Sequence, residues 1–139
     1  MLPFEFILTG RPISNQTKDK SKLQVWIAAV RRAANQSWPN DNPVDDNVRI
    51  KLTHYFDTPS GKEENVPDSD NIVKPIRAAL TGIVYEYDYQ VTDVTSRRRN
   101  LNGSFRVKGI SLTLAEGFIK GEEFVHVMIE VAPDPSDLR

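Results

Sequence analysis

The stretch that decides the fold reads VPDSDNIVK at residues 66–74 and is followed by YEYDYQV at residues 85–91. Pro67 fixes its own φ angle and pushes the residue before it into an extended conformation. The Asp and Asn residues that come next are good helix N-caps, and apolar residues at helical spacing continue to Gly82, which favours a helix end. The stretch therefore predicts an extended entry followed by a helix over about 71–81.

Acidic and basic side chains are spaced so that they meet near the start of this helix. If the chain is extended from Asp68 to Asp70, both carboxylates leave the same side, because strand geometry repeats every two residues. Lys74 lies one helical turn after Asp70 and emerges near the same face. The helix is roughly 16 Å long, and an extended return covers roughly 20 Å. Asp88 is therefore expected beside the helix N-terminus.

The convergence of three carboxylates, one ammonium group and a helix N-terminus indicates a particular chemistry. Carboxylate oxygens suit Mg²⁺, with Mn²⁺ as a second option. The helix dipole and Lys74 favour an anionic substrate such as a phosphodiester. A calcium-binding EF-hand loop is excluded, because Val73 and Ala79 stand where that loop needs Gly and a bidentate Glu.

The combination of Asp-x-Asp-Asn-x-x-Lys, then Ala-Leu, then Asp-x-Gln-Val resembles the RusA-type Holliday junction resolvases over residues 68–91. In that family three Asp residues bind a divalent metal and a Lys belongs to the active site. The matching catalytic residues in this chain are Asp68, Asp70, Lys74 and Asp88. The chain departs from the family pattern at Ala78 and Tyr87, where family members often carry acids.

The resemblance implies a RusA-like homodimer that cleaves branched DNA, chiefly four-way junctions, by paired symmetric nicks that need Mg²⁺. Two alternatives remain open. A non-catalytic DNA-binding homologue is suggested by the weak net charge and the two missing acids. A metal-dependent phosphodiesterase acting on smaller nucleotide substrates would use the same carboxylates and would not need a dimer.

Composition limits the class of protein. The chain has 139 residues, which suits one domain with its own core, and 39% hydrophobic and 27% charged residues, which is typical of a globular protein. The chain has no Cys, which excludes disulfides and thiolate metal sites. Apolar runs are too short to span a membrane, and Glu5 interrupts the only apolar run near the N-terminus, so a cytoplasmic location is expected. The net charge of −1 argues mildly against a nucleic-acid-binding protein.

The remaining pattern predicts an α+β fold, with a small mixed sheet of about four strands and two packed helices. A long helix is expected from a cap at Thr17 or Asp19 to about Asn35. A single domain is expected over 1–131 and a frayed tail over 132–139. A further strand pair is expected within 105–114, in a stretch that looks like an insertion. The main strands are expected at residues 3–9, 48–56, 90–99 and 124–131.

Three consecutive arginines, Arg97, Arg98 and Arg99, end the third expected strand. Because side chains alternate across a strand, at least one of them should face a bound substrate if the strand borders the site. We therefore predict DNA contacts from these arginines and from Lys74. The polar loop over 57–65 leads directly into the acidic motif and is predicted to act as a flap over the substrate.

Two histidines, His54 and His126, lie on expected strands far apart in the sequence. Their spacing matches no metal-ligand pattern, so we predict structural roles for both.

Overall fold

The computed structural model describes residues 1–138 and contains four strands and three α-helices. The predicted α+β fold with a four-stranded mixed sheet is therefore confirmed, with one helix more than expected. The elements in chain order are β1 (Phe4–Thr9), α1 (Lys20–Ser37), β2 (Val48–Phe56), α2 (Val73–Leu80), β3 (Val91–Asn100), α3 (Leu112–Lys120) and β4 (Phe124–Val131). Short 3₁₀ turns occur at Glu63–Asn65, Ser69–Ile72 and Asp88–Gln90.

The strands lie in the order β1-β4-β2-β3. β4 pairs antiparallel with both β1 and β2, whereas β2 and β3 pair in parallel. A parallel pair needs a crossover connection, and here the crossover is the segment that contains the acidic motif and α2. β2 is a central strand, and its parallel partner β3 forms one edge of the sheet. The acidic motif therefore lies in the connection that joins a central strand to an edge strand.

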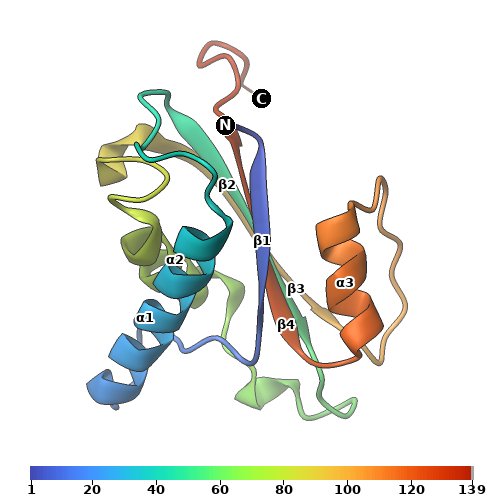
Figure 1. Cartoon of the computed structure of the whole chain (residues 1–139). Coiled ribbons are helices and arrows are strands. Elements are labelled where there is room, and N and C mark those ends of the chain that lie inside the picture. Colours follow the sequence, from blue (N-terminus) through green and yellow to red (C-terminus); the bar gives the residue numbers. More distant parts are fainter. Residues whose placement is uncertain (139) are drawn as a thin grey trace.

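The helices are divided between the two faces of the sheet (Figure 1). α1 and α2 pack on one face, and α3 packs on the other. Side chains alternate along β2 accordingly, with Ile50 and Leu52 in the main core beneath α1 and α2. Tyr55 points the other way and packs with Leu114 of α3 and Phe124 of β4. We call these the α2 face and the α3 face of the sheet.

The long first helix begins where its cap was predicted. The Asp19 carboxylate accepts a hydrogen bond from the Lys22 backbone N–H at 3.0 Å, and the helix then runs two residues beyond the expected end. Arg31, on its outer side, donates to the backbone carbonyls of Ala79 and Thr81 at 3.1 and 2.9 Å. These carbonyls lie at the C-terminus of α2, where a cation also complements the helix dipole. The contact fixes α2 against α1.

The expected strand pair within 105–114 is wrong, because the chain forms a loop there and then α3. The Ser111 hydroxyl caps α3 by accepting from the Leu114 N–H at 3.1 Å. Gly117 sits against the Phe124 ring so closely that a Cβ atom would lie 2.5 Å from it. The serine cap starts the helix, and the glycine lets it pack closely on the α3 face. Neither residue favours a strand.

Beyond β4 the chain continues as a turn in which the Asp134 carboxylate accepts from the Ser136 N–H at 2.9 Å and hydroxyl at 2.7 Å. The frayed tail predicted over 132–139 includes Arg139, which lies outside the described residues. Within residues 1–138, no helix has the length and apolar content needed to cross a membrane.

Candidate functional site

The acidic motif enters α2 through a 3₁₀ turn rather than through an extended segment. Asp68 is extended, with φ −63° and ψ 147°, but Ser69–Ile72 is a 3₁₀ helix that joins directly to α2. The prediction that Asp68 and Asp70 leave the same side of a strand is therefore wrong. The reason is local. The Asp68 carbonyl accepts a hydrogen bond from the Asn71 N–H at 3.0 Å, so the chain is already helical when it reaches Asp70.

Three of the four predicted catalytic residues line one pocket beside α2, which we call the α2 pocket. Its volume is about 650 Å³. It is lined by Asp70, Val73, Lys74, Arg77, Ala78, Thr81 and Asp88. Asp88 does return to the helix as predicted, but it lies against Arg77 in the last turn of α2 and not beside the helix N-terminus. The path differs from the extended one expected, because Gly82, at φ +87°, turns the chain and donates its N–H to the Tyr85 carbonyl at 2.7 Å.

Asp88 forms an ion pair with Arg77 of α2. The guanidinium donates from Nε to Oδ1 and from Nη2 to Oδ2, both at 2.9 Å, and also to the Asp88 carbonyl at 3.1 Å. This two-pronged contact is the geometry in which Arg binds carboxylate most strongly. Sequence reasoning missed Arg77, although its place three residues after Lys74 puts both cations on one helix face.

Gln90 explains why an amide follows Asp88 by two residues. Its side chain is buried, and its amide oxygen accepts from the Glu86 and Tyr87 N–H groups at 3.0 and 2.9 Å. Its amide nitrogen donates to the carbonyls of Val44 and Asp46, both at 2.9 Å. Two loops that are distant in sequence are thereby joined by one side chain, and the joined backbone presents Asp88 to α2.

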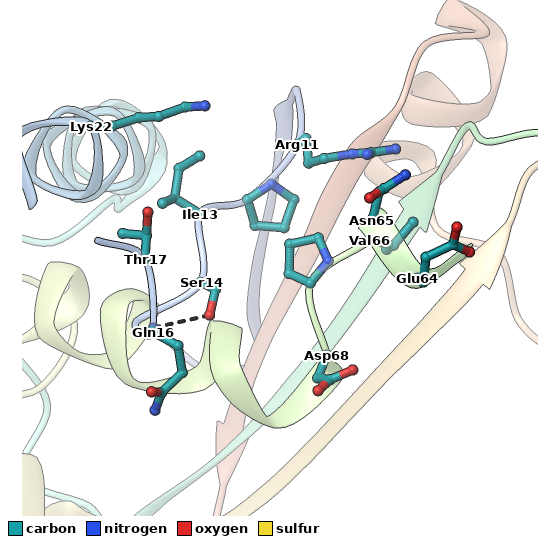
Figure 2. Close-up of a pocket in the computed structure, with 12 residues that line it drawn as sticks. Arg11, Ile13, Ser14, Gln16, Thr17, Lys22, Glu64, Asn65, Val66 and Asp68 are labelled. Atoms are coloured by element: carbon teal, nitrogen blue, oxygen red, sulfur yellow. Dashed lines mark hydrogen bonds between the residues drawn. The ribbon is translucent and has the colours of Figure 1, made fainter. Parts of the chain in front are cut away.

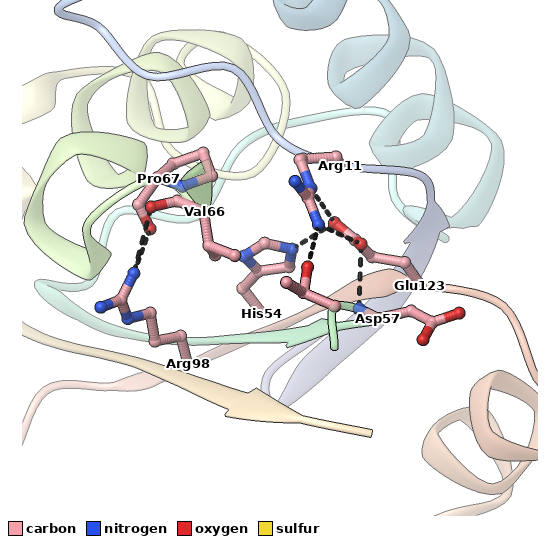
Figure 3. Close-up of polar contacts among 8 residues, drawn as sticks. Arg11, His54, Asp57, Val66, Pro67, Arg98 and Glu123 are labelled. Carbon is pink, nitrogen blue, oxygen red and sulfur yellow. Dashed lines mark hydrogen bonds and ion pairs between the residues drawn. The ribbon is translucent and has the colours of Figure 1, made fainter. Parts of the chain in front are cut away.

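The other end of the motif is attached to β3. The Ser96 hydroxyl donates to the Ser69 carbonyl at 2.6 Å. Arg98 donates to the Val66 carbonyl at 3.1 Å and lies 4.0 Å from the Asp68 carboxylate. Figure 3 shows Arg98 reaching from β3 toward the chain around Pro67. One of the three predicted arginines therefore lies beside the acidic motif.

The two neighbouring arginines lie on the opposite side of the sheet. Arg97 donates to the Thr53 hydroxyl at 3.1 Å, and both Arg97 and Arg99 line a groove on the α3 face. The alternation of a strand separates them from Arg98. DNA contact by all three stays a prediction, but the three side chains do not share one face of the sheet.

Asp68 lines a second, open groove rather than the α2 pocket. This groove has a volume of about 610 Å³ and lies between the 11–17 segment and the 64–68 segment. Figure 2 shows Asp68 at one end of it, with Arg11 and Lys22 farther along. Its carboxylate side chain is 69% exposed. The acidic motif thus borders two neighbouring hollows, with Asp68 facing one and Asp70 the other.

A network of charged side chains fixes the start of the loop that leads to the motif (Figure 3). Glu123 accepts from Arg11 Nε at 2.8 Å and from the Asp57 N–H at 3.0 Å, and lies 2.7 Å from His54 Nε2. Burial alone would raise the pKa of Glu123, but hydrogen bonds from His54, Arg11 and Asp57 lower it to about 2. Arg11 also donates to the Thr58 hydroxyl at 2.6 Å.

The same network assigns His54 a structural position. Its side chain is buried and held by Glu123, which agrees with the structural role predicted for it. His126 lies 3.1 Å from the Glu5 carboxylate on the α3 face. The loop over 57–65 is tied at its start, and whether its middle acts as a flap stays a prediction.

The three Asp residues provide the hard oxygen donors that Mg²⁺ prefers. Asp70 and Asp88 share the α2 pocket, whereas Asp68 faces the adjoining groove. Among residues 1–138, no three acidic or histidine side chains are gathered closely enough to form a metal site. The donor type fits a divalent cation, and the ligand set predicted from the sequence stays a prediction.

Comparison with known protein families gives a match over most of the chain. The family model described as Endodeoxyribonuclease RusA matches residues 4–108, which is about three quarters of the chain. The matched range runs from β1 through the acidic motif and β3 to the loop before α3. No curated protein matches the chain at a significant level.

Proposed function

The chain belongs to the RusA endodeoxyribonuclease family, and from that membership we propose that it resolves four-way DNA junctions by paired symmetric nicks that depend on Mg²⁺. The family supports a Holliday-junction-resolving endonuclease, and its resolvases are generally dependent on a divalent metal. The finer proposal rests on one observation: Asp70, Lys74 and Asp88 line the same pocket.

In this proposal Asp68, Asp70 and Asp88 hold the cation. A divalent cation bound there would lower the pKa of a coordinated water molecule and offset negative charge on the scissile phosphate. Arg77 competes with the cation for Asp88, since a guanidinium that donates to both carboxylate oxygens offsets the negative charge that attracts a metal and fixes the orientation of the carboxylate. The Asp68 side chain is free to turn, because its carboxylate is largely exposed and its contact with Arg98 is long.

Lys74 is the residue that we propose to act on the phosphate. It emerges from α2 into the pocket that also holds two of the three acids. Its ammonium group can approach the phosphoryl oxygens and offset the charge that builds up on them during reaction. Arg98 lies on the edge strand β3 beside Asp68. We propose that it binds a phosphate next to the scissile one on the same DNA strand.

Two symmetric nicks require two sites, and a two-fold homodimer would present two equivalent α2 pockets to one junction. We therefore propose a homodimer acting in the cytoplasm on branched DNA. Sedimentation of the protein with and without a four-way junction would test the dimer directly.

The activity is tested by single-turnover cleavage of a four-way junction with each strand labelled, across a Mg²⁺ titration. Wild-type protein should nick two opposed strands symmetrically, and should leave a linear duplex of the same sequence intact. Asp70→Asn should abolish cleavage while retaining junction binding, because a ligand and one negative charge are removed. Asp41→Asn, in an exposed loop outside the pocket, is the matched control and should cut normally.

A second candidate function is favoured by a specific contact. Because Arg77 occupies both oxygens of Asp88, the chain can also be a non-catalytic homologue that only binds junctions. That protein would bind four-way junctions with an affinity that does not respond to Mg²⁺, and would yield no nicked product at any Mg²⁺ concentration. Wild-type cleavage at the rate of Asp70→Asn would favour it over the nuclease.

A further inference from the structure

The α3 face carries a groove that plays no part in the proposed chemistry. It has a volume of about 410 Å³ and lies between β2, the edge strand β3 and the loop before α3. Five cationic side chains line it, and no carboxylate does. They are Lys51, Arg97, Arg99, Arg106 and Lys108. We call this hollow the basic groove.

Most of these cations have no acidic partner. Lys51 lies 3.3 Å from a Glu130 oxygen. The other four form no ion pair within 4.0 Å with any of residues 1–138. Gathering unpaired like charges in one hollow costs free energy through mutual repulsion, and it creates a positive potential that attracts polyanions. A surface with this pattern fits an anionic ligand better than a solvated face alone.

The arrangement of the cations indicates a chain of phosphates rather than a single phosphate. Arg97 and Arg99 leave the same face of β3 about 6.6 Å apart along the strand. Arg106 and Lys108 face them from the loop wall, which is held because Phe105 packs on Tyr55 with ring centroids 5.6 Å apart. Five cations exceed the charge of one compact phosphate, whereas one DNA strand carries a charge every 3.4 Å along its axis and can supply one phosphate after another.

The edge strand connects this groove with the acidic motif. β3 has no strand beyond it in the sheet, so DNA is not obstructed by a further strand as it crosses from one face to the other. Arg98 points to the acidic motif, and its two neighbours point into the basic groove. Three successive residues thus present cations to both sides of a single edge.

We propose that the basic groove binds the backbone of DNA, outside the α2 pocket, and so holds a part of the junction that is not being cut. The statement about cutting rests on the proposed function, whereas DNA binding in the groove does not. Arg97 and Arg99 therefore serve in affinity and in orienting the junction, and they take no part in the reaction at the phosphate.

The test uses two double variants that remove groove charges, Arg106→Gln/Lys108→Gln and Arg97→Gln/Arg99→Gln. The matched control, Lys18→Gln/Arg32→Gln, removes two exposed cations that line none of the three hollows described above. Affinity for a four-way junction is measured without Mg²⁺ over a range of salt concentrations. Each lost phosphate contact should reduce the slope of log affinity against log salt by about 0.9. We expect a reduction of roughly 1.8 for each groove variant and no change for the control.

Single-turnover cleavage, followed up to saturating DNA, is the second measurement. The groove variants should need a higher DNA concentration to reach half of the maximal rate, and the maximal rate should fall far less than the affinity, since the α2 pocket is intact. An unchanged salt slope in both groove variants would overturn the proposal, and so would an equal reduction in the control. A large loss of cleavage rate at saturating DNA would also overturn it, because the groove would then belong to the reaction site. If wild-type protein cuts nothing but the groove variants lose slope, the proposed nuclease fails and the groove stands.

Discussion

The α2 pocket and the basic groove, which lie on opposite faces of the sheet, differ in how their charges are balanced. On the α2 face, Arg77 is paired with Asp88, and Arg98 lies between backbone carbonyls and Asp68. On the α3 face, the arginines on either side of Arg98 have no acidic partner among the described residues. Balanced charge suits a site where a metal and a phosphate replace existing contacts, and unbalanced charge suits a surface that only binds.

This difference also shows why the net charge of the chain does not predict whether it can bind DNA. A total of −1 argued mildly against nucleic-acid binding. The structure separates the charges in space, so that five cations line one groove without an acid. The total is therefore a poor guide to what either face can bind.

Lys74→Ala should give the largest effect, and it should be confined to the α2 face. Loss of one group that offsets charge in the transition state typically costs on the order of 10²–10³ in rate. Single-turnover cleavage at saturating Mg²⁺ should fall by that factor, with dimerisation and thermal stability retained. Lys74→Arg should recover only part of the rate, because a planar fork does not reproduce a compact point charge. Normal cleavage by Lys74→Ala at high Mg²⁺ would reduce Lys74 to a counter-ion.

Glu123→Gln should give the next largest effect, through stability and not through chemistry. Removing one member of a buried ion pair typically costs about 3–5 kcal/mol. Because this pair is only partly buried, with the Arg11 side chain 36% exposed, we expect a loss below that range, about 2 kcal/mol. Chemical unfolding at neutral pH would measure it. Glu130→Gln, at a more exposed ion pair on the α3 face, is the comparison and should cost less.

The same variant has a defined pH dependence. The pKa of Glu123 is lowered from an ordinary value of 4.5 to about 2 in the folded protein. Its stabilising contribution is complete above pH 4.5 and is lost as the pH falls from there toward 2. The stability difference between wild type and Glu123→Gln should therefore shrink across this window. A difference that stays constant down to pH 2 would mean that the carboxylate is not held as the structure shows.

Gly117→Ala tests whether the two faces are independent. Alanine favours helices by about 1 kcal/mol over glycine, but its Cβ atom would lie 2.5 Å from the Phe124 ring. Overpacking of this kind costs about 1–3 kcal/mol, so we expect net destabilisation in thermal unfolding. Junction cleavage at saturating DNA should be unchanged, because the α2 pocket is on the opposite face. Leu112→Ala, on the exposed side of α3, is the control.

The strands and the two helices on the α2 face could be predicted because their signals are local. Alternation along β2 and the cap at Asp19 identify elements without reference to the rest of the chain. The α3 helix could not be predicted with the same success. Its position depends on the contact between Gly117 and Phe124, which is a tertiary contact, and a lone Gly within an apolar segment argues locally against a helix.

The candidate site shows the same division. The return of Asp88 to α2 follows from chain lengths alone and is confirmed, but its position beside the last turn, where Arg77 holds it, differs from the predicted helix N-terminus. The separation of Asp68 from Asp70 was missed, because a 3₁₀ turn and an extended entry have no distinct signature over three residues. Arg77 was missed for a different reason: a cation in the last turn of a helix is expected from the helix dipole, so its second role is invisible until Asp88 is beside it.

Arg77→Gln is the smallest expected effect and the sharpest test of how the α2 face is balanced. The pair is partly exposed, with Asp88 66% accessible, so its loss should cost at most about 1 kcal/mol in stability. The same substitution should strengthen metal binding, although it weakens the fold. In the wild type, the Asp88 oxygens are held by two hydrogen bonds from Arg77, whose positive charge also repels an approaching metal cation. In the variant they are available from the start, while the glutamine keeps most of the side-chain volume. We therefore expect the variant to bind Mn²⁺ more tightly, measured by calorimetry without DNA, together with a slightly lower melting temperature.

Arg31→Gln, which removes a cation bound only to carbonyls at the end of α2, should lower stability without changing the affinity for the metal. Equal or weaker metal binding by Arg77→Gln would mean that Asp88 is held by Arg77 for structure alone and does not belong to the metal site.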